Sequence, residues 1–371
     1  MKIAILSMQR VDNYGSLLQS YSLKKILESK GHDVYFLDIE PRAKDDQLLE
    51  RDRLDFVCER EKGGAGLAAK LQRIDKYFFY RLIHKVQYAK RQQCMQAFRT
   101  QYLEIQKNND FFDLCIIGSD EVFNCLDSSE WGFTSQLFGE VRNANKVITY
   151  AASCGATQHE MVPQQVKYCI SRSFDNIAAF SVRDENTCQF VKSMTSKQVS
   201  IHADPVVLGE FSHEMKAADQ VGRISQKYCL IYSYHNRFHG KKEIDAIVKF
   251  CRKHKLKPIA VGAAQKWIRS FWVGGPFELL NLFLNASFVI TDTFHGAIFS
   301  AKYAPRFAVL SRESNRNKLD YLLRTLEIEE HHLNDINELD RVFSIEKNSE
   351  QVKKRERELK NEAMRYLEMY L

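Results

Sequence analysis

The stretch Val289-Ile290-Thr291-Asp292-Thr293-Phe294-His295-Gly296-Ala297-Ile298-Phe299-Ser300 sets the fold class of this chain. The apolar run 288–290 predicts a buried strand, the polar residues after it a tight turn, and the small and apolar residues 297–301 a helix. In an open α/β sheet such a turn lies at the carboxyl end of a strand, where ligands collect, and the N–H groups of the next helix favour an anion. The stretch therefore predicts an α/β fold with a ligand-binding crevice.

His295 is the candidate acid or base of this turn, and Gly296 beside it lets a ligand approach the backbone. The alternative is a purely structural role, in which Asp292 or Thr293 caps the helix and His295 packs in the core. The pattern alone leaves both interpretations open.

The composition is that of a globular protein: 371 residues, 44% hydrophobic and 27% charged, are enough for two domains. No apolar run approaches the ~20 residues that span a bilayer, and the first residues read as a strand and not as a secretory signal. Nine cysteines stand apart, with no C-x-x-C pair and no histidine at zinc spacing. We expect reduced thiols in a cytoplasmic protein that needs no metal.

The net charge of +7 suits phosphorylated or other anionic partners. No recognised nucleic-acid-binding motif accompanies this charge, so we expect no nucleic-acid partner.

The first part of the chain alternates strands with helices. The predicted strands are 2–6, 34–39, 113–117, 146–152 and 178–182, and the predicted helices are 16–30 and 164–173. Asn13 and Gly15 precede the first helix, where a side-chain amide and free N–H groups suit an anion or a sugar; the alternative is an Asx turn with glycine at a positive φ. Only one glycine stands where a dinucleotide fingerprint has three, so a nucleotide cofactor site is not supported.

Polar residues also follow later strands of this part. Ser119, Asp120 and Asn124 come after 113–117, and Arg183 comes after 178–182. An arginine at a strand end suits a carboxylate or a phosphate, whereas its structural alternative is a salt bridge with a neighbouring acid. Asp204-Pro205 interrupts the pattern, so we predict a first domain of residues 1–205.

Residues 42–110 are charged and helical in character, which indicates a helical insertion in the first domain. Within them, residues 70–91 hold seven Lys or Arg and one acidic residue, interleaved with aromatic side chains. A basic amphipathic helix suits the surface of an anionic membrane; the alternative is a helix packed on the domain with a solvated basic face.

The second part, residues 206–371, repeats the strand and helix pattern and ends in a charged helix. Its predicted strands are 228–232, 258–261, 288–290 and 306–310, and its predicted helices are 241–254, 277–285, 319–326 and 346–371. Arg312, Arg316 and Lys318 lie in the polar loop 311–318, where they suit an anion facing His295; the alternative is a solvated loop. We predict two doubly wound Rossmann-like domains that face a cleft formed by strand ends.

Six motifs stand in order along the chain. They are residues 13–21 (NYGSLLQSY), 117–124 (IGSDEVFN), 150–155 (YAASCG), 181–184 (SVRD), 204–205 (DP) and 290–296 (ITDTFHG). In order and spacing they resemble the polysaccharide pyruvyl transferase family. Glu121, Phe123 and Cys154 depart from its usual Gln, Trp and aromatic residue, changes that alter a pocket without changing the reaction.

The resemblance implies a fold like that of two-domain GT-B glycosyltransferases, and transfer of a pyruvyl group from phosphoenolpyruvate onto a sugar as a ketal. It makes His295 the expected acid or base that protonates the donor. The expected ligands of the donor anions are Arg183, Arg312 and Arg316, and those expected to recognise hydroxyl groups or to orient His295 are Asn13, Gly15, Ser119, Asp120, Asn124 and Asp292.

The expected partners are phosphoenolpyruvate, with no further cofactor, and a sugar of a bacterial surface polysaccharide or of its lipid-linked precursor. Two alternatives stay open: a glycosyltransferase with a nucleotide-sugar donor, and a non-catalytic subunit of a polysaccharide-synthesis complex.

Overall fold

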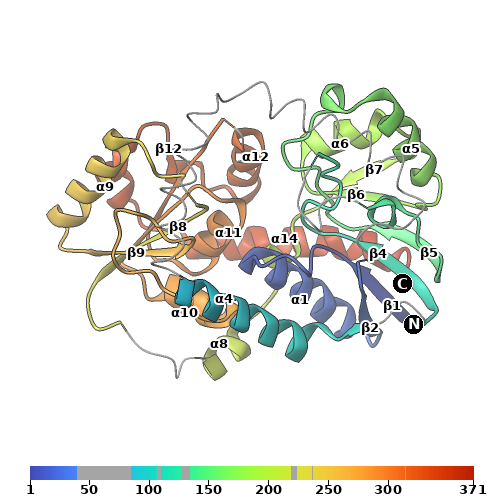
Figure 1. Ribbon diagram of the computed structural model, residues 1–371, viewed down its shortest axis with the longest axis horizontal. Coiled ribbons are helices and arrows are strands. Elements are labelled where there is room, and N and C mark those ends of the chain that lie inside the picture. The colour runs from blue at the N-terminus through green and yellow to red at the C-terminus, as the bar shows by residue number, and fades with distance from the viewer. Residues whose placement is uncertain (40–84, 107–109, 127–133, 219–223, 236, 314) are drawn as a thin grey trace.

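The computed structural model describes residues 1–39, 85–106, 110–126, 134–218, 224–235, 237–313 and 315–371. Two five-stranded sheets form its framework, one in each half of the chain (Figure 1). Every described strand pair in them is parallel, so the connections between strands cross over and cover both faces with helices. The α/β class with two doubly wound domains is therefore confirmed.

The first sheet has the strand order β3-β2-β1-β4-β5. Its strands are β1 (Lys2–Leu6), β2 (Asp33–Leu37), β3 (Ile105–Gln106), β4 (Phe112–Ile117) and β5 (Ala144–Thr149). A further parallel pair, β6 (Phe180–Val182) and β7 (Val199–Ile201), continues beyond β5 through an isolated bridge between Ile148 and Ala179. The order reverses between β1 and β4, which creates a crevice at the carboxyl ends of these two strands.

The second sheet has the strand order β12-β11-β10-β8-β9. Its strands are β8 (Tyr228–Ser233), β9 (Lys257–Gly262), β10 (Phe288–Thr291), β11 (Phe307–Leu310) and β12 (His332–Leu333). Here the order reverses between β8 and β10, so the stretch with which the sequence analysis began lies at the second reversal point.

Helices surround both sheets. In chain order they are α1 (Tyr14–Glu28), α4 (Lys85–Phe98), α5 (Gln164–Phe174), α6 (Glu185–Lys192), α7 (Pro205–Leu208), α8 (Ser212–Ala218), α9 (Lys241–Lys253), α10 (Pro276–Leu284), α11 (Phe294–Tyr303), α12 (Arg316–Leu326), α13 (Leu339–Phe343) and α14 (Ser349–Glu368). Along β1, Ile3 and Ile5 face one core while Ala4 and Leu6 face another, which is the period of two of a strand buried on both faces.

The two domains share one of these cores. The core that holds Ile3 and Ile5 also holds Tyr232 of β8 and Phe283 of α10. Tyr21 of α1 and Phe277 of α10 pack edge to face, with ring centroids 5.3 Å apart. The domains are thus joined by continuous apolar packing and not only by a linker.

The last helix, α14, contacts both domains. Lys302 of α11 pairs with Glu356 at 3.2 Å, while Tyr366 donates to the backbone oxygen of Thr149 at 2.9 Å. Figure 1 shows α14 running from the second domain into the first, where both chain ends lie. The predicted terminal helix therefore exists and completes the first domain as well; the boundary at residue 205 stays a prediction.

Residues 42–84 and 107–109 of the predicted insertion lie outside the described residues, and with them most of the basic stretch 70–91. The described remainder includes α4 and, unexpectedly, β3 at the edge of the first sheet. A strand of two residues has no readable period, so the sequence did not indicate it. None of the helices within the described ranges is both long and apolar enough to cross a membrane.

Candidate active site

The reversal points of both sheets carry the residues expected at the site. Asn13 and Gly15 follow β1, Ser119 and Asp120 follow β4, and His295 follows β10. The contacts of His295 with Gly15 and with Asp204 bring the two reversal points together across the domain interface.

His295 lies in the first turn of α11 and is only 5% exposed. Thr293 caps this helix, because its side chain accepts the N–H of Gly296 at 3.0 Å. Nε2 of His295 lies 3.5 Å from Oδ2 of Asp204, which belongs to the first domain. This separation exceeds an ordinary hydrogen bond, and Nε2 has no such bond within the described part of the chain, so the contact is a close charge contact.

Gly15 makes room for His295. A Cβ at this position would lie 2.1 Å from Nδ1 of the imidazole, which no side chain permits. Asn13 caps α1 by accepting the Gly15 N–H at 2.8 Å, but Gly15 itself is helical and not at a positive φ. The Asx turn of the structural alternative is therefore present, but the expected positive φ is wrong: this position needs glycine because the imidazole of His295 lies against it.

Asp204 and Arg183 form a buried ion pair behind the imidazole. Nη1 of Arg183 lies 2.9 Å from Asp204 and 3.7 Å from Asp120, and its guanidinium stands 4.1 Å from the ring centroid of Phe294. Burial works against ionisation of Asp204, but His295 and Arg183 outweigh it and hold the pKa of this carboxyl well below its usual range. We call His295, Asp204, Arg183 and Asp120 the histidine cluster.

Arg183, expected to hold a donor anion, is therefore paired with carboxylates of the protein, as its structural alternative stated. Ser119 is also fully buried, and its hydroxyl lies 2.8 Å from the backbone oxygen of Ala151 and 3.2 Å from Asp204. Asp120 adopts a φ of 72° and accepts a hydrogen bond from Ser16. Arg183 and Asp120 thus belong to the histidine cluster, and Ser119 donates to its Asp204.

Asp292 is fully buried and turned toward the second domain. Its carboxylate accepts the Ser233 hydroxyl at 2.6 Å and Nε of Arg312 at 3.2 Å. Burial raises the pKa of Asp292 in spite of these donors. The carboxylate beside His295 is Asp204, so Asp292 instead orients Arg312.

A cavity of about 810 Å³ opens between the domains. We call it the basic cavity, because its lining includes Arg237, Arg312, Arg316 and Lys318, together with Asn124, Thr157 and Asn186 from the first domain. Nη2 of Arg312 is buried there with no hydrogen-bond partner among the described residues, while the Arg316 side chain is exposed. Asn315 donates to the backbone oxygen of Asp292 at 2.7 Å and ties the loop 311–318 to the turn before His295.

An ion pair closes one wall of the basic cavity. Nζ of Lys318 lies 2.8 Å from Glu121 of the first domain, and Asn124 donates to the same carboxylate at 3.0 Å. Mainly through Lys318, the pKa of Glu121 is lowered to about 2. Asn124 in turn accepts the Thr157 hydroxyl at 2.8 Å. Glu121, one of the departures from the family pattern, thus fastens the two domains together.

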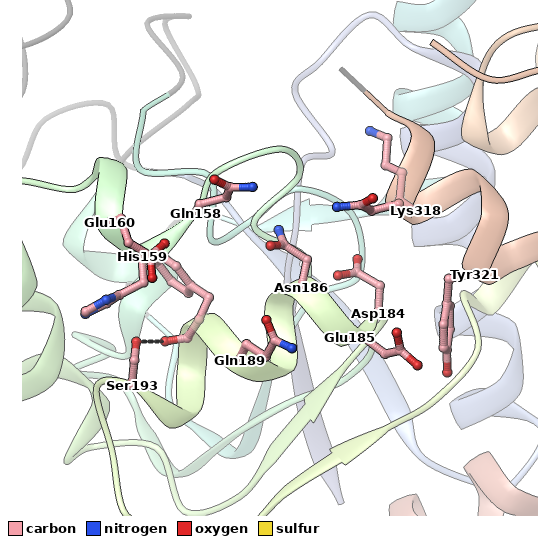
Figure 2. A pocket seen from close by; sticks show the side chains of 12 residues that line it. Gln158, His159, Glu160, Asp184, Glu185, Asn186, Gln189, Ser193, Lys318 and Tyr321 are labelled. Atoms are coloured by element: carbon pink, nitrogen blue, oxygen red, sulfur yellow. Dashed lines mark hydrogen bonds between the residues drawn. The ribbon is translucent and has the colours of Figure 1, made fainter. Parts of the chain in front are cut away.

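A second cavity, of about 360 Å³, lies next to the first (Figure 2). We call it the amide cavity, because Gln158, Asn186, Gln189 and Asn317 line it, with Glu160, Glu185 and Tyr321. Four of the residues that line it also line the basic cavity, namely Gln158, Asn186, Asn317 and Lys318. The two cavities therefore adjoin, and the sequence analysis predicted nothing about the second.

Sequence reasoning also missed the role of Asp204, which it used only to mark a domain boundary. The available signal was its place among the six motifs, because a boundary alone does not require an acid before proline. Within the described ranges, no three His, Cys, Asp or Glu side chains gather as metal ligands would, and the expectation that no metal is needed stays a prediction.

A model of the family described as "Polysaccharide pyruvyl transferase" matches residues 13–314. No curated protein sequence matches the chain. Among solved structures it is similar to UDP-GlcNAc 2-epimerase from Neisseria meningitidis bound to UDP-GlcNAc (11% identity, 100% of this chain and 99% of that chain, TM-score 0.47). It is also similar to UDP-GlcNAc 2-epimerase from Methanocaldococcus jannaschii in complex with UDP-GlcNAc and UDP (11% identity, 97% of this chain and 99% of that chain, TM-score 0.45). A third similar structure is the E. coli heptosyltransferase WaaC with ADP (8% identity, 85% of this chain and 90% of that chain, TM-score 0.39). Similarity at these levels identifies neither a ligand nor a reaction.

Proposed function

This chain belongs to the polysaccharide pyruvyl transferase family, and from that premise we propose that it transfers a pyruvyl group from phosphoenolpyruvate onto a sugar, forming a ketal. The observation that carries the proposal is the imidazole of His295, seated against Gly15 with Nε2 3.5 Å from the buried Asp204. A histidine held in this way at the junction of two domains suits proton transfer to a substrate that enters between them.

The basic cavity supports the choice of donor. Phosphoenolpyruvate carries a phosphate and a carboxylate, and a guanidinium binds either of them with two parallel hydrogen bonds. The exposed Arg316 offers such a pair of donors, whereas Arg312 keeps only Nη2 without a partner among the described residues, because its Nε pairs with Asp292 and its Nη1 with Glu243. Asn315 and Arg312 of this loop bond to Asp292, three residues before His295, which supports a donor site near the imidazole.

The chemistry proceeds in two stages. His295, protonated, gives its proton to the methylene carbon of the donor, and the neighbouring carbon becomes an oxocarbenium that one sugar hydroxyl attacks. The proton of this first hydroxyl passes to the now neutral imidazole of His295. Phosphate then departs with its bonding electrons and takes that proton, leaving as hydrogen phosphate. A second hydroxyl of the same sugar attacks the carbon, gives its proton to His295 and closes the ketal, which restores the protonated imidazole. Asp204 supplies a negative charge beside the imidazole while it carries its proton.

The proposed acceptor is a sugar of a bacterial surface polysaccharide or of its lipid-linked precursor, met at the inner face of the cell membrane. The basic residues 70–91 support contact with anionic lipid, and Lys85, Lys90 and Arg91 of this stretch belong to α4. Unchanged binding to anionic liposomes after charge reversal in this stretch would remove that part of the proposal.

The test measures phosphate release from phosphoenolpyruvate with a panel of lipid-linked and nucleotide-linked sugars. We expect release only with an acceptor, a product heavier by one pyruvyl ketal, and a loss of at least about 100-fold in His295→Ala. The matched control is His213→Ala, because His213 is exposed on α8. A folded wild type that neither binds phosphoenolpyruvate nor releases phosphate contradicts the proposal and favours a nucleotide-sugar donor or a non-catalytic subunit.

A further inference from the structure

The amide cavity and the basic cavity share a wall but differ in charge. The amide cavity is lined by the carboxylates of Glu160, Asp184 and Glu185, and Lys318 is its only lysine or arginine among the described residues. Lys318 is itself paired with Glu121, so its charge is already balanced. The amide cavity therefore disfavours anions, whereas the adjoining basic cavity favours them.

The amide side chains of the amide cavity are suited to bind the hydroxyl groups of a ligand. The side chains of Gln158 and Gln189 are exposed and have no hydrogen-bond partner in the described part of the chain. Each amide presents two donors and one acceptor oxygen, a combination that matches adjacent hydroxyls of a sugar ring. Asp184 is different, because Ser153 and Thr187 already donate to its carboxylate.

Tyr321 supplies an apolar face in the same cavity. It projects from α12 of the second domain, while Gln189 projects from α6 of the first, and Figure 2 shows Asp184 and Glu185 between the two. The ring of a tyrosine packs against the C–H face of a pyranose while its rim stays polar. With about 360 Å³, the cavity lies in the usual range of about 300–1,000 Å³ for small-molecule sites.

We propose that the amide cavity binds the acceptor sugar, as an uncharged or amino-bearing pyranose stacked on Tyr321, while the basic cavity holds the anions of the donor. The assignment rests on the proposed function, which requires an acceptor beside the donor. It adds the substrate class: the ring that is pyruvylated carries no phosphate or carboxylate of its own, and any phosphate of a carrier lies outside this cavity.

The position of the cavity agrees with this division. Two adjacent residues follow β6. Arg183 pairs with Asp204 of the histidine cluster, and Asp184, the next residue, lines the amide cavity. Lys318 and Asn317 border both cavities, which places a sugar in one beside an anion in the other.

The experiment measures binding of methyl hexosides, methyl N-acetylhexosaminides and hexosamine by saturation-transfer NMR, with hexose 6-phosphate as the anionic comparison. We expect at least one uncharged or amino sugar to bind, and the 6-phosphate to bind at least about tenfold more weakly. Tyr321→Leu and Gln189→Ala should each weaken sugar binding about tenfold, whereas Tyr321→Phe keeps it. Binding of phosphoenolpyruvate should stay unchanged in all three, and Gln165→Ala on the exposed face of α5 is the matched control.

The assignment is overturned if no sugar of the panel binds, if the 6-phosphate binds best, or if Tyr321→Leu and Gln189→Ala bind sugars as the wild type does. Failure of the proposed function looks different. If sugar binding depends on Tyr321 but the protein does not bind phosphoenolpyruvate, the amide cavity is a sugar site and the proposed pyruvyl transfer is wrong. If phosphate release requires an acceptor but the KM for that acceptor does not change in Tyr321→Leu, the proposed reaction is supported and the acceptor does not bind in the amide cavity.

Discussion

The histidine cluster and the basic cavity hold charged groups in opposite ways. In the cluster, Arg183 is nearly fully buried and is paired with Asp204 at 2.9 Å. In the cavity, Arg316 is exposed and Nη2 of Arg312 has no partner among the described residues. Asp204 and Asp120 balance the charge of Arg183, although Nε of Arg183 and Nε2 of His295 have no hydrogen-bond partner among the described residues. The exposed Arg316 has no ion pair with any described residue, so its charge is left to solvent or to a ligand.

This difference separates positioning from binding. A buried charge must be compensated by the protein itself, so the charges of the cluster fix geometry and are not available to a substrate. Charges at a cavity surface stay hydrated until a ligand replaces the water. Substitutions in the cluster should therefore affect folding and turnover, and substitutions in the cavity should affect affinity.

The largest expected effect is on stability. Asp204→Ala leaves Arg183 buried without its 2.9 Å partner, which should cost about 3–5 kcal/mol of unfolding free energy. Arg316→Ala should change it by less than about 0.5 kcal/mol, because the side chain is exposed. Urea unfolding of both variants measures the contrast, and Arg183→Met added to Asp204→Ala should recover part of the loss. Equal losses in the two single variants would abolish the distinction between the regions.

The next effect is on turnover. Gly15→Ala adds a Cβ that would lie 2.1 Å from Nδ1 of His295, so the imidazole must be displaced. Misplacement of a catalytic group by about 1 Å costs about 100-fold, so kcat should fall by this factor while the KM for phosphoenolpyruvate stays unchanged. Gly240→Ala is the control, since its Cβ would meet nothing closer than 3.9 Å. Full activity in Gly15→Ala argues against His295 as the acid.

The sequence predicted both residues of this contact, Gly15 and His295, as site residues, but not that they touch. The turn after β10 and the helix after β1 follow from local patterns of apolar and polar residues. The contact between Gly15 and His295 depends on how two domains pack, and no local pattern records that arrangement. For this reason the glycine was given a positive-φ alternative that the structure excludes.

The same limit applies to charges. Arg183 was correctly placed at a strand end, but its partner Asp204 stands beyond β7, a strand of three residues that the sequence analysis did not predict. Long strands and amphipathic helices were predictable because they repeat a period, and short edge elements such as β3 were not. The amide cavity also escaped prediction, because it is assembled from α6, α12 and a loop that are distant in sequence.

A smaller effect is expected in the basic cavity. Arg316→Ala should raise the KM for phosphoenolpyruvate about tenfold and leave kcat nearly unchanged, because one charge-assisted contact to the donor is lost. The KM of Arg316→Lys should lie between those of the wild type and Arg316→Ala, since lysine keeps the positive charge but not the two parallel N–H donors of the guanidinium. Arg357→Ala, on an exposed position of α14, controls for net charge. A fall in kcat without a change in KM would mean that Arg316 positions catalytic groups, as the histidine cluster does, and does not bind the donor.

The smallest effect concerns the ion pair that borders both cavities. Lys318 lowers the pKa of Glu121 from 4.5 to about 2, so the unfolded chain takes up a proton at higher pH than the folded one. This stability is present above about pH 4.5 and is lost as the pH falls toward 2. Because the Glu121 side chain is 31% exposed, solvent screening leaves about 1 kcal/mol.

Glu121→Gln should therefore be about 1 kcal/mol less stable at pH 7 and should lose less stability than the wild type between pH 4.5 and 2. Chemical unfolding across this pH range measures the difference. Parallel pH curves for the two proteins would show that the contact contributes nothing.

The path of α14 has a consequence for how the protein is made. The helix follows both sheets in the chain, yet Tyr366 and Glu368 near its end bond to Thr149 and Lys30 of the first domain. Domains generally fold as units while the chain is synthesised, amino-terminal first. The first domain must therefore wait, one surface uncovered, until the second domain has emerged from the ribosome and α14 returns to cover it.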